Sequence, residues 1–245
     1  MSQSDSVPSA EYGAAVESLA VRLLAALRGT GDFPGLAAHV DSAADTKAAL
    51  AAVRVLGPDV FAPALLASVR FGPDDRDVVY EALSVFPSAP DDPPEVACLA
   101  QATTALLIRY GAGAAGIPDP ASGESAPVLP EISHWRAWAQ RIARLSPMAL
   151  PGIESPVITD AGLRVLALKR GLARSMLRRD YPTAARLARW AALVQSREGA
   201  LPGIDIEPVV EHLELCGAVG ARTVLDTEIA ARLIAGRGAR RGDGA

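Results

Sequence analysis

The fold of this chain is decided by residues 131–197, which read EISHWRAWAQRIARLSPMALPGIESPVITDAGLRVLALKRGLARSMLRRDYPTAARLARWAALVQSR. Apolar residues recur in this stretch three and four positions apart, which is the spacing of amphipathic helices. Proline and glycine interrupt the pattern twice, so we predict three helices over about residues 131–145, 160–179 and 182–197. All three tryptophans of the chain lie here.

The remaining sequence has the same helical character. Half of the 245 residues are hydrophobic, but only 4% are aromatic, and alanine and leucine supply most of the apolar content. Such a composition favours helix, and no run of residues alternates between apolar and polar as a strand would. We therefore predict an all-α fold of about ten helices, arranged as one helical array or as two small bundles.

Glycine, proline and serine mark the expected domain boundaries. They dominate residues 111–130, which form the longest predicted loop. This segment is either a linker or a mobile lid, and its small residues favour a linker. It separates an acidic bundle at 10–110 from a bundle with basic helices at 131–235. We expect disordered tails at 1–9 and 236–245.

One helix hairpin has a recognisable turn. The elbow at residues 180–182 reads DYP and is followed by Ala184 and Ala185, and it resembles the turn of a tetratricopeptide repeat hairpin. The resemblance covers only the hairpin near residues 160–197. The small residues expected earlier in the repeat are out of register, and no second copy follows at a period of about 34 residues. The resemblance implies a pair of packed helices and no family membership.

Charge is unevenly distributed along the chain. Residues 1–130 carry 7 Lys or Arg and 16 Asp or Glu, a net charge of −9, whereas residues 136–197 carry 12 and 3, a net charge of +9. An acidic first half could dock on this basic segment within one molecule or across a dimer. The alternative is a basic surface that binds an external anion.

Arg170, Arg174 and Arg178 concentrate the positive charge, because residues four apart lie on one side of a helix. Arg186 and Arg189 on the next helix could extend this ridge. Guanidinium groups bind phosphate, sulfate and carboxylate in a bidentate fork, so the ridge could hold a partner's acidic surface or a small anion. It could also be a solvated face or pair with the chain's own acids. The acidic overall charge and the lack of a recognition helix or zinc module argue against nucleic acid.

A second candidate site lies at the start of the same stretch. Glu131 and His134 are three residues apart and could act as an acid and a base, and Trp135 and Trp138 could line a small-molecule pocket with them. The alternative is that the tryptophans are core anchors and His134 is a surface residue. The E-x-x-H spacing also occurs in di-iron bundles, but those need a second copy, which this sequence lacks.

Several classes of protein are excluded by missing motifs. The sequence has no phosphate-binding glycine loop, no nucleophile elbow, no HExxH and no Cys/His cluster, so we predict neither a metal nor a cofactor. The two cysteines, Cys98 and Cys216, are far apart in the chain. No apolar run approaches the roughly 20 residues of a membrane helix, and the first residues do not resemble a signal peptide. We expect a cytoplasmic protein without a membrane anchor.

These observations favour a non-catalytic function. We predict a protein-interaction protein or accessory subunit whose partner is another protein subunit or a second copy of the chain. The alternative is an all-α enzyme, or a subunit of one, that acts on a small molecule bearing phosphate, sulfate or carboxylate. Its pocket would lie between the helix containing Glu131 and Trp138 and the arginine-rich helices.

Overall fold

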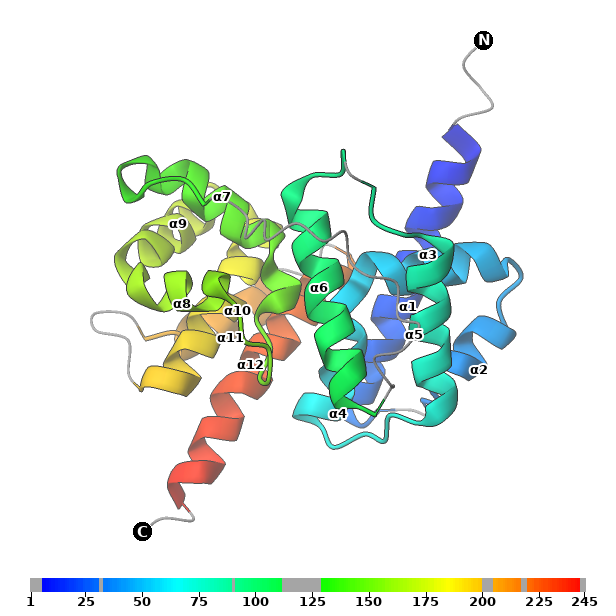
Figure 1. The fold of residues 1–245 in the computed structure, drawn as a ribbon. Helices are drawn as coiled ribbons and strands as arrows, with labels where there is room; N and C mark the ends of the chain where they lie inside the picture. Colours follow the sequence, from blue (N-terminus) through cyan, green and yellow to red (C-terminus); the bar gives the residue numbers. More distant parts are fainter. Residues whose placement is uncertain are drawn as a thin grey trace. The chain divides into compact units, whose positions relative to one another are not determined.

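The computed structural model describes residues 6–30, 33–89, 91–111, 129–199, 205–216 and 220–242. Its regular elements are helices, and these described ranges contain no strand, which confirms the all-α class (Figure 1). Contacts divide the chain into two compact units, unit 1 at Met1–Glu124 and unit 2 at Ser125–Ala245. Most of the predicted linker, residues 112–128, lies outside the described residues, so its nature stays a prediction.

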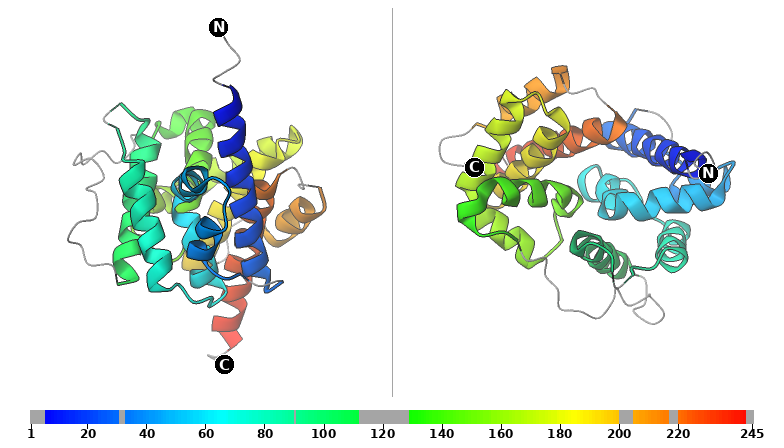
Figure 2. Two further views of the ribbon diagram at one scale, coloured as in Figure 1. Left: turned by 90° about the vertical axis from the view of Figure 1, so that its right-hand side faces the viewer. Right: turned by 90° about the horizontal axis from the view of Figure 1, so that it is seen from above.

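Unit 1 is built around a central helix. Its elements are α1 (Ser6–Arg28), α2 (Leu36–Asp41), α3 (Thr46–Leu56), the 3-10 turn η1 (Gly57–Phe61), α4 (Ala62–Leu66), α5 (Pro73–Val85) and α6 (Pro94–Arg109). Helix α3 packs against α1, α2 and α5 (Figure 2). Three leucines of α1 recur four residues apart and are buried, namely Leu19, Leu23 and Leu27, so α1 turns one continuous apolar face toward the core.

One buried carboxylate fixes the start of two helices in unit 1. Asp75 Oδ1 accepts hydrogen bonds from the backbone nitrogens of Leu36 (2.7 Å) and Ala37 (3.2 Å), and Oδ2 accepts one from Gly72 (3.0 Å). The first N–H groups of a helix have no partner within it. Asp75 supplies that partner to both α2 and α5 and so fixes their relative position.

The segment Thr46–Leu66 is the most apolar part of unit 1. Among the described residues it alone is long and apolar enough, by length and composition, to cross a bilayer, and 72% of its most apolar window is buried in the protein. Its backbone leaves the α-helical conformation at Gly57, where φ is +55°. The segment is therefore a mostly buried, interrupted helix in the core of unit 1.

Unit 2 is also organised around one helix. Its elements are η2 (Ile132–His134), α7 (Trp135–Arg144), η3 (Ser146–Met148), α8 (Pro156–Leu163), α9 (Val165–Leu177), α10 (Tyr181–Glu198), α11 (Glu207–Cys216) and α12 (Ala221–Gly242). Helix α10 packs against each of the other α-helices of this unit. Trp190, near its middle, is fully buried and donates a hydrogen bond from Nε1 to the Ile142 carbonyl (2.8 Å).

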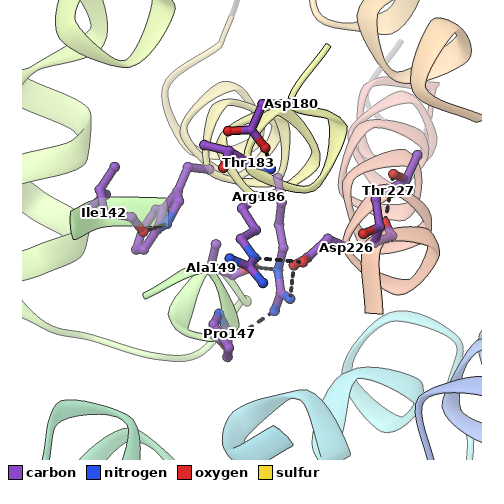
Figure 3. A network of polar contacts seen from close by, with 11 residues as sticks. Ile142, Pro147, Ala149, Asp180, Thr183, Arg186, Asp226 and Thr227 are labelled. Carbon is purple, nitrogen blue, oxygen red and sulfur yellow. Dashed lines mark hydrogen bonds and ion pairs between the residues drawn. The ribbon is translucent and has the colours of Figure 1, made fainter. Parts of the chain in front are cut away.

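A buried arginine links α10 to neighbouring segments through a polar network around Pro147, Ala149 and Asp226, which Figure 3 shows. Arg189 is fully buried. Its guanidinium pairs with Asp226 of α12 (3.1 Å) and donates to the carbonyls of Ala149 (3.2 Å) and Pro147 (3.3 Å). Arg186 approaches the other oxygen of Asp226 (3.8 Å). Arg189 therefore belongs to the core of unit 2, and its predicted place in a surface ridge was wrong.

The expected helix over residues 160–179 is two helices. The chain breaks at Arg164 (φ −109°, ψ 37°) between α8 and α9. The Arg164 side chain pairs with Asp160 one helical turn earlier (2.7 Å) and donates to the carbonyl of Pro130 (2.7 Å). The second contact joins residues 34 positions apart, so helical periodicity cannot reveal it. Helices α9 and α10 do pack as a hairpin, but the resemblance to a tetratricopeptide repeat is not confirmed.

Helix extends into both predicted tails. Helix α1 begins at Ser6, and α12 continues through the Gly/Arg segment to Gly242. Arginine and alanine are good helix formers, and a single glycine weakens a helix by only about 1 kcal/mol. Residues 1–5 and 243–245 lie outside the described part of the chain.

Candidate functional site

Three helices of unit 2 enclose a pocket of about 270 Å³, here called the arginine pocket. Helix α7 contributes Trp135, Arg136, Ala139 and Gln140. Helix α9 and its C-cap residue contribute Gly171, Arg174, Ser175 and Arg178, and the N-cap and first turns of α10 contribute Asp180, Thr183 and Leu187. The lining therefore joins one indole, three guanidinium groups, two hydroxyls and a carboxamide. These groups offer many hydrogen-bond donors to a ligand.

Gly171 explains why α7 and α9 come so close. A Cβ at this position would lie 2.6 Å from the Cβ of Ala139 and 3.2 Å from a methyl group of Leu187. Only glycine allows the helix backbones to approach this closely. Arg174 and Arg178 lie three and seven residues further along the same side of α9. The contact at Gly171 therefore brings both arginines beside Trp135.

A more open groove adjoins the pocket along α9, here called the side groove. Its volume is about 530 Å³, and it is lined by Trp135, Arg170, Ala173, Arg174, Leu177 and Arg178. The Leu177 side chain is 86% exposed, and Trp135 is half-buried with the Arg136 guanidinium 5.3 Å from its ring centroid. An apolar strip therefore runs between exposed arginines.

The described residues of unit 2 do not neutralise the positive charge of this site. Arg164, Arg189, Arg197 and Arg232 each pair with a carboxylate. In the described part of the chain, Arg170, Arg174 and Arg178 make no ion pair and are exposed. The lining includes one carboxylate, that of Asp180, which accepts a hydrogen bond from the Thr183 nitrogen (3.2 Å) and caps α10.

The structure separates the two candidate tryptophans. Trp135 lines both the pocket and the groove. Trp138 is fully buried and donates from Nε1 to Asp160 Oδ2 (2.7 Å). The prediction that Trp138 contacts a ligand or partner is therefore wrong, and it is a core anchor. The two residues are three apart, and α7 turns one toward the core and the other toward the edge of the site.

Glu131 and His134 lie outside the pocket lining. The α-helix expected from Glu131 begins at Trp135, and Glu131 only precedes the 3-10 turn that His134 ends. Both residues are exposed, and His134 Nδ1 lies 3.3 Å from the Ser133 hydroxyl oxygen. The structure therefore gives this pair no common helical face and no contact with the arginine pocket.

Several lining residues escaped prediction, although their spacing carries a signal. Positions 171, 174, 175 and 178 follow the i, i+3, i+4, i+7 rule for one helix face, and Arg136 and Gln140 are four apart on α7. The sequence does not show that these two faces meet. Within the described ranges, no group of three or more His, Cys, Asp or Glu residues could hold a metal ion.

Comparison with known proteins finds no matching family model, no matching curated protein and no matching solved structure. Fold alone does not determine function. The function of the site therefore has to be argued from its own chemistry.

Proposed function

We propose that unit 2 binds an acidic, partly apolar segment of a partner protein across the arginine pocket and the side groove. One observation carries this proposal. Arg170, Arg174 and Arg178 are exposed and make no ion pair with any described residue, beside a Leu177 side chain that is 86% exposed. An interface segment with carboxylates and one large apolar side chain complements this surface in charge and in polarity.

The energetics of α9 support an external anion. Like charges four residues apart destabilise a helix by about 0.2–0.5 kcal/mol per pair. Arg170 and Arg174 form one such pair within α9, and Arg178, the C-cap residue, lies four positions after Arg174. No described carboxylate pairs with these groups to offset the repulsion. Carboxylates of a partner would remove it and form charge-assisted hydrogen bonds.

The size of the pocket favours a side chain over a whole small molecule. Small-molecule sites commonly have volumes of roughly 300–1,000 Å³, and the arginine pocket has about 270 Å³. Pockets that receive one anchoring side chain are typical of protein interfaces, where tryptophan and arginine supply much of the binding energy. Trp135, Arg174 and Arg178 are residues of this kind and are shared by pocket and groove.

Fluorescence anisotropy with a defined probe tests the proposal. The probe is a labelled 12-residue peptide that alternates pairs of Glu with pairs of Leu, and the control peptide has Gln in place of Glu. We expect the acidic peptide to bind and the Gln peptide to bind at least tenfold more weakly. Binding should weaken as salt is raised, because exposed charges are screened.

Two variants locate the binding site. Replacing Arg174 and Arg178 with Gln should weaken peptide binding about tenfold, or about 1.4 kcal/mol. The matched control is Lys169→Gln, which removes one charge from the same helix without touching the pocket or groove. Equal binding by both variants, or no binding of the acidic peptide, would exclude the proposal. Self-association lost in the double variant would identify a second copy of the chain as the partner.

A small anion is the second candidate ligand. The convergence of Arg136, Arg174 and Arg178 with two hydroxyl side chains favours it. Phosphate and citrate serve as probes. If either one binds more tightly than the acidic peptide and depends on the same arginines, a small-molecule site replaces the interaction surface as the function of unit 2.

A further inference from the structure

His39 in unit 1 is a buried imidazole. Its relative exposure is 6%, and neither Nδ1 nor Nε2 has a hydrogen-bond partner among the described residues. A buried polar group left unsatisfied destabilises a protein by about 1–3 kcal/mol. The groups that surround His39 indicate which kind of ligand could form the missing hydrogen bonds.

His39 lines a cavity of about 500 Å³ between α1, the end of α2 and the start of α3. This volume lies inside the range of roughly 300–1,000 Å³ that is usual for small-molecule sites. The cavity exists because both facing helices carry alanines there, with Ala14 and Ala15 on α1 and Ala48 and Ala49 on α3. Alanine gives the walls an apolar surface and leaves the space open.

A water molecule beside His39 would find few other hydrogen-bond partners. A buried water molecule normally makes two to four hydrogen bonds, and half of the residues that line the cavity are alanines. The Ser42 hydroxyl already donates to the His39 carbonyl (3.2 Å). A ligand with an apolar body and one polar end matches the walls and the imidazole together.

Arg22 determines the charge of that polar end. It lines the same cavity, makes no ion pair with a described residue, and lies close enough to influence His39. Burial lowers the pKa of His39, and the positive charge of Arg22 lowers it further. The imidazole is therefore neutral at pH 7 and offers one donor and one acceptor. A carboxylate in the cavity can accept a hydrogen bond from the guanidinium. Both imidazole nitrogens are closed to solvent in this structure, so the carboxylate would accept a second bond from His39 once the ring turns toward the cavity.

The acidic residues of the cavity do not prevent this arrangement. Asp45 caps α3 by accepting a hydrogen bond from the Ala48 nitrogen (3.0 Å). Glu11 lies eleven residues before Arg22 on α1, which is roughly 16 Å along the helix axis. That separation exceeds the screening length of about 8–10 Å at ordinary salt. We infer that the cavity binds an aliphatic monocarboxylate, with its head group at Arg22 and His39 and its chain along the alanines.

Imidazole nitrogen spectra of protein carrying ¹⁵N-labelled histidine test the inference, with sodium octanoate as the probe. His134 and His212 are exposed and serve as internal references. We expect octanoate to shift the His39 signals saturably and leave the other two in place. Acetate lacks the chain and hexanol lacks the carboxylate, so neither should produce the saturable shift.

Three variants test whether octanoate binds in this cavity. Arg22→Gln should weaken octanoate binding about tenfold, as expected for the loss of a charged hydrogen bond, and Lys47→Gln on α3 should leave it unchanged. Ala14→Leu adds a side chain at an exposed position that lines the cavity, so it should block binding while the protein stays folded. The inference is overturned if octanoate leaves the His39 signals unshifted, or if the shift and its concentration dependence are the same in Arg22→Gln as in the unaltered protein. The Arg174 and Arg178 variants of unit 2 should bind octanoate normally, which keeps this test separate from that of the proposed function.

Discussion

At the scale of single residues, the buried Arg189 has the largest expected effect on stability. Its guanidinium binds the Asp226 carboxylate and the backbone carbonyls of Ala149 and Pro147 while fully excluded from solvent. Removing one partner of a buried ion pair destabilises a protein by about 3–5 kcal/mol, because the other charge stays buried. We expect Arg189→Met to lower the free energy of unfolding of unit 2 by this amount, measured by urea denaturation.

A double variant distinguishes the lost pair from lost packing. Replacing Asp226 with Leu in the Arg189→Met protein removes both charges, and apolar replacements of a buried pair are often neutral or stabilising. Much of the lost stability should therefore return. Additive losses in the two single variants and the double variant would contradict this account.

Gly35 is the residue least tolerant of a side chain in unit 1. Its φ is +105°, and a Cβ there would lie 2.6 Å from Asp75 Oδ1, the oxygen that caps α2. Backbone strain and a disturbed cap each destabilise by about 1–3 kcal/mol, so Gly35→Ala should destabilise unit 1 by about 2–6 kcal/mol. The control is Gly13→Ala in α1, where nothing lies within 4 Å, and it should be neutral or stabilising. Equal effects in thermal denaturation would refute the role of Asp75.

His39 makes unit 1 sensitive to acid. Burial and Arg22 lower its pKa below the ordinary value of 6.5, so the unfolded chain binds a proton more readily than the folded one. Stability is then lost as pH falls from 6.5 toward the folded pKa. Glu11 and Asp45, which line the same cavity, are the nearby acids. Urea denaturation between pH 7 and 5 should show this loss, and His39→Gln should reduce the slope. An unchanged slope would assign the effect to other groups.

At the scale of helices, the contact at Gly171 controls the geometry of the arginine pocket. Alanine usually favours a helix over glycine by about 1 kcal/mol. Here its Cβ would lie 2.6 Å from the Ala139 Cβ, and the backbones of α7 and α9 would have to separate. Gly171→Ala should therefore destabilise unit 2 and weaken binding of the acidic peptide together. Unchanged peptide affinity would show that the pocket does not depend on this approach.

The same helices show how far sequence predicts structure. The four-residue spacing of Arg170, Arg174 and Arg178 predicts a common side of a helix because it depends only on local periodicity. The burial of Arg189 depends on Asp226, which lies 37 residues away. The break at Arg164 likewise depends on the Pro130 carbonyl. Contacts of this kind leave no periodic signal in a sequence.

The candidate sites also depend on contacts between segments that are far apart in the sequence. Trp135 and Trp138 have the same residue type and similar neighbours in sequence, and the position of α7 on α9 decides which one is buried. His39 has no distinguishing motif at all. Its interest comes from the alanine-lined cavity beside it, which forms only when three segments of unit 1 are packed together.

At the scale of the whole molecule, each unit carries its own spectroscopic or chemical probe. All three tryptophans belong to unit 2, and Cys98 is buried in unit 1. Burial, with a further contribution from the Glu95 carboxylate, raises the pKa of the Cys98 thiol to about 11. Because the thiolate is the reactive form, Cys98 should react with a disulfide reagent at neutral pH only after unit 1 opens, whereas the exposed Cys216 should react at once.

These probes should report two separate transitions. Each unit has its own core, and unfolding need not be two-state in such a chain. Arg189→Met should lower the urea midpoint followed by tryptophan fluorescence and leave that of Cys98 labelling unchanged. Gly35→Ala should do the reverse. Coincident shifts in both variants would show that the units unfold as one.

The ion pair between Arg189 and Asp226 also has a consequence for synthesis on the ribosome. The arginine emerges well before the aspartate, because α10 precedes α12 in the chain. Until α12 has left the ribosome, the nascent unit 2 would have to bury the Arg189 guanidinium without the Asp226 carboxylate, so α10 should remain only loosely held. Domains generally fold from the N-terminus as they emerge, but completion of unit 2 awaits one of its last helices. A premature stop ahead of α12 should therefore yield a chain whose tryptophans stay accessible to quenchers and whose second half is readily degraded.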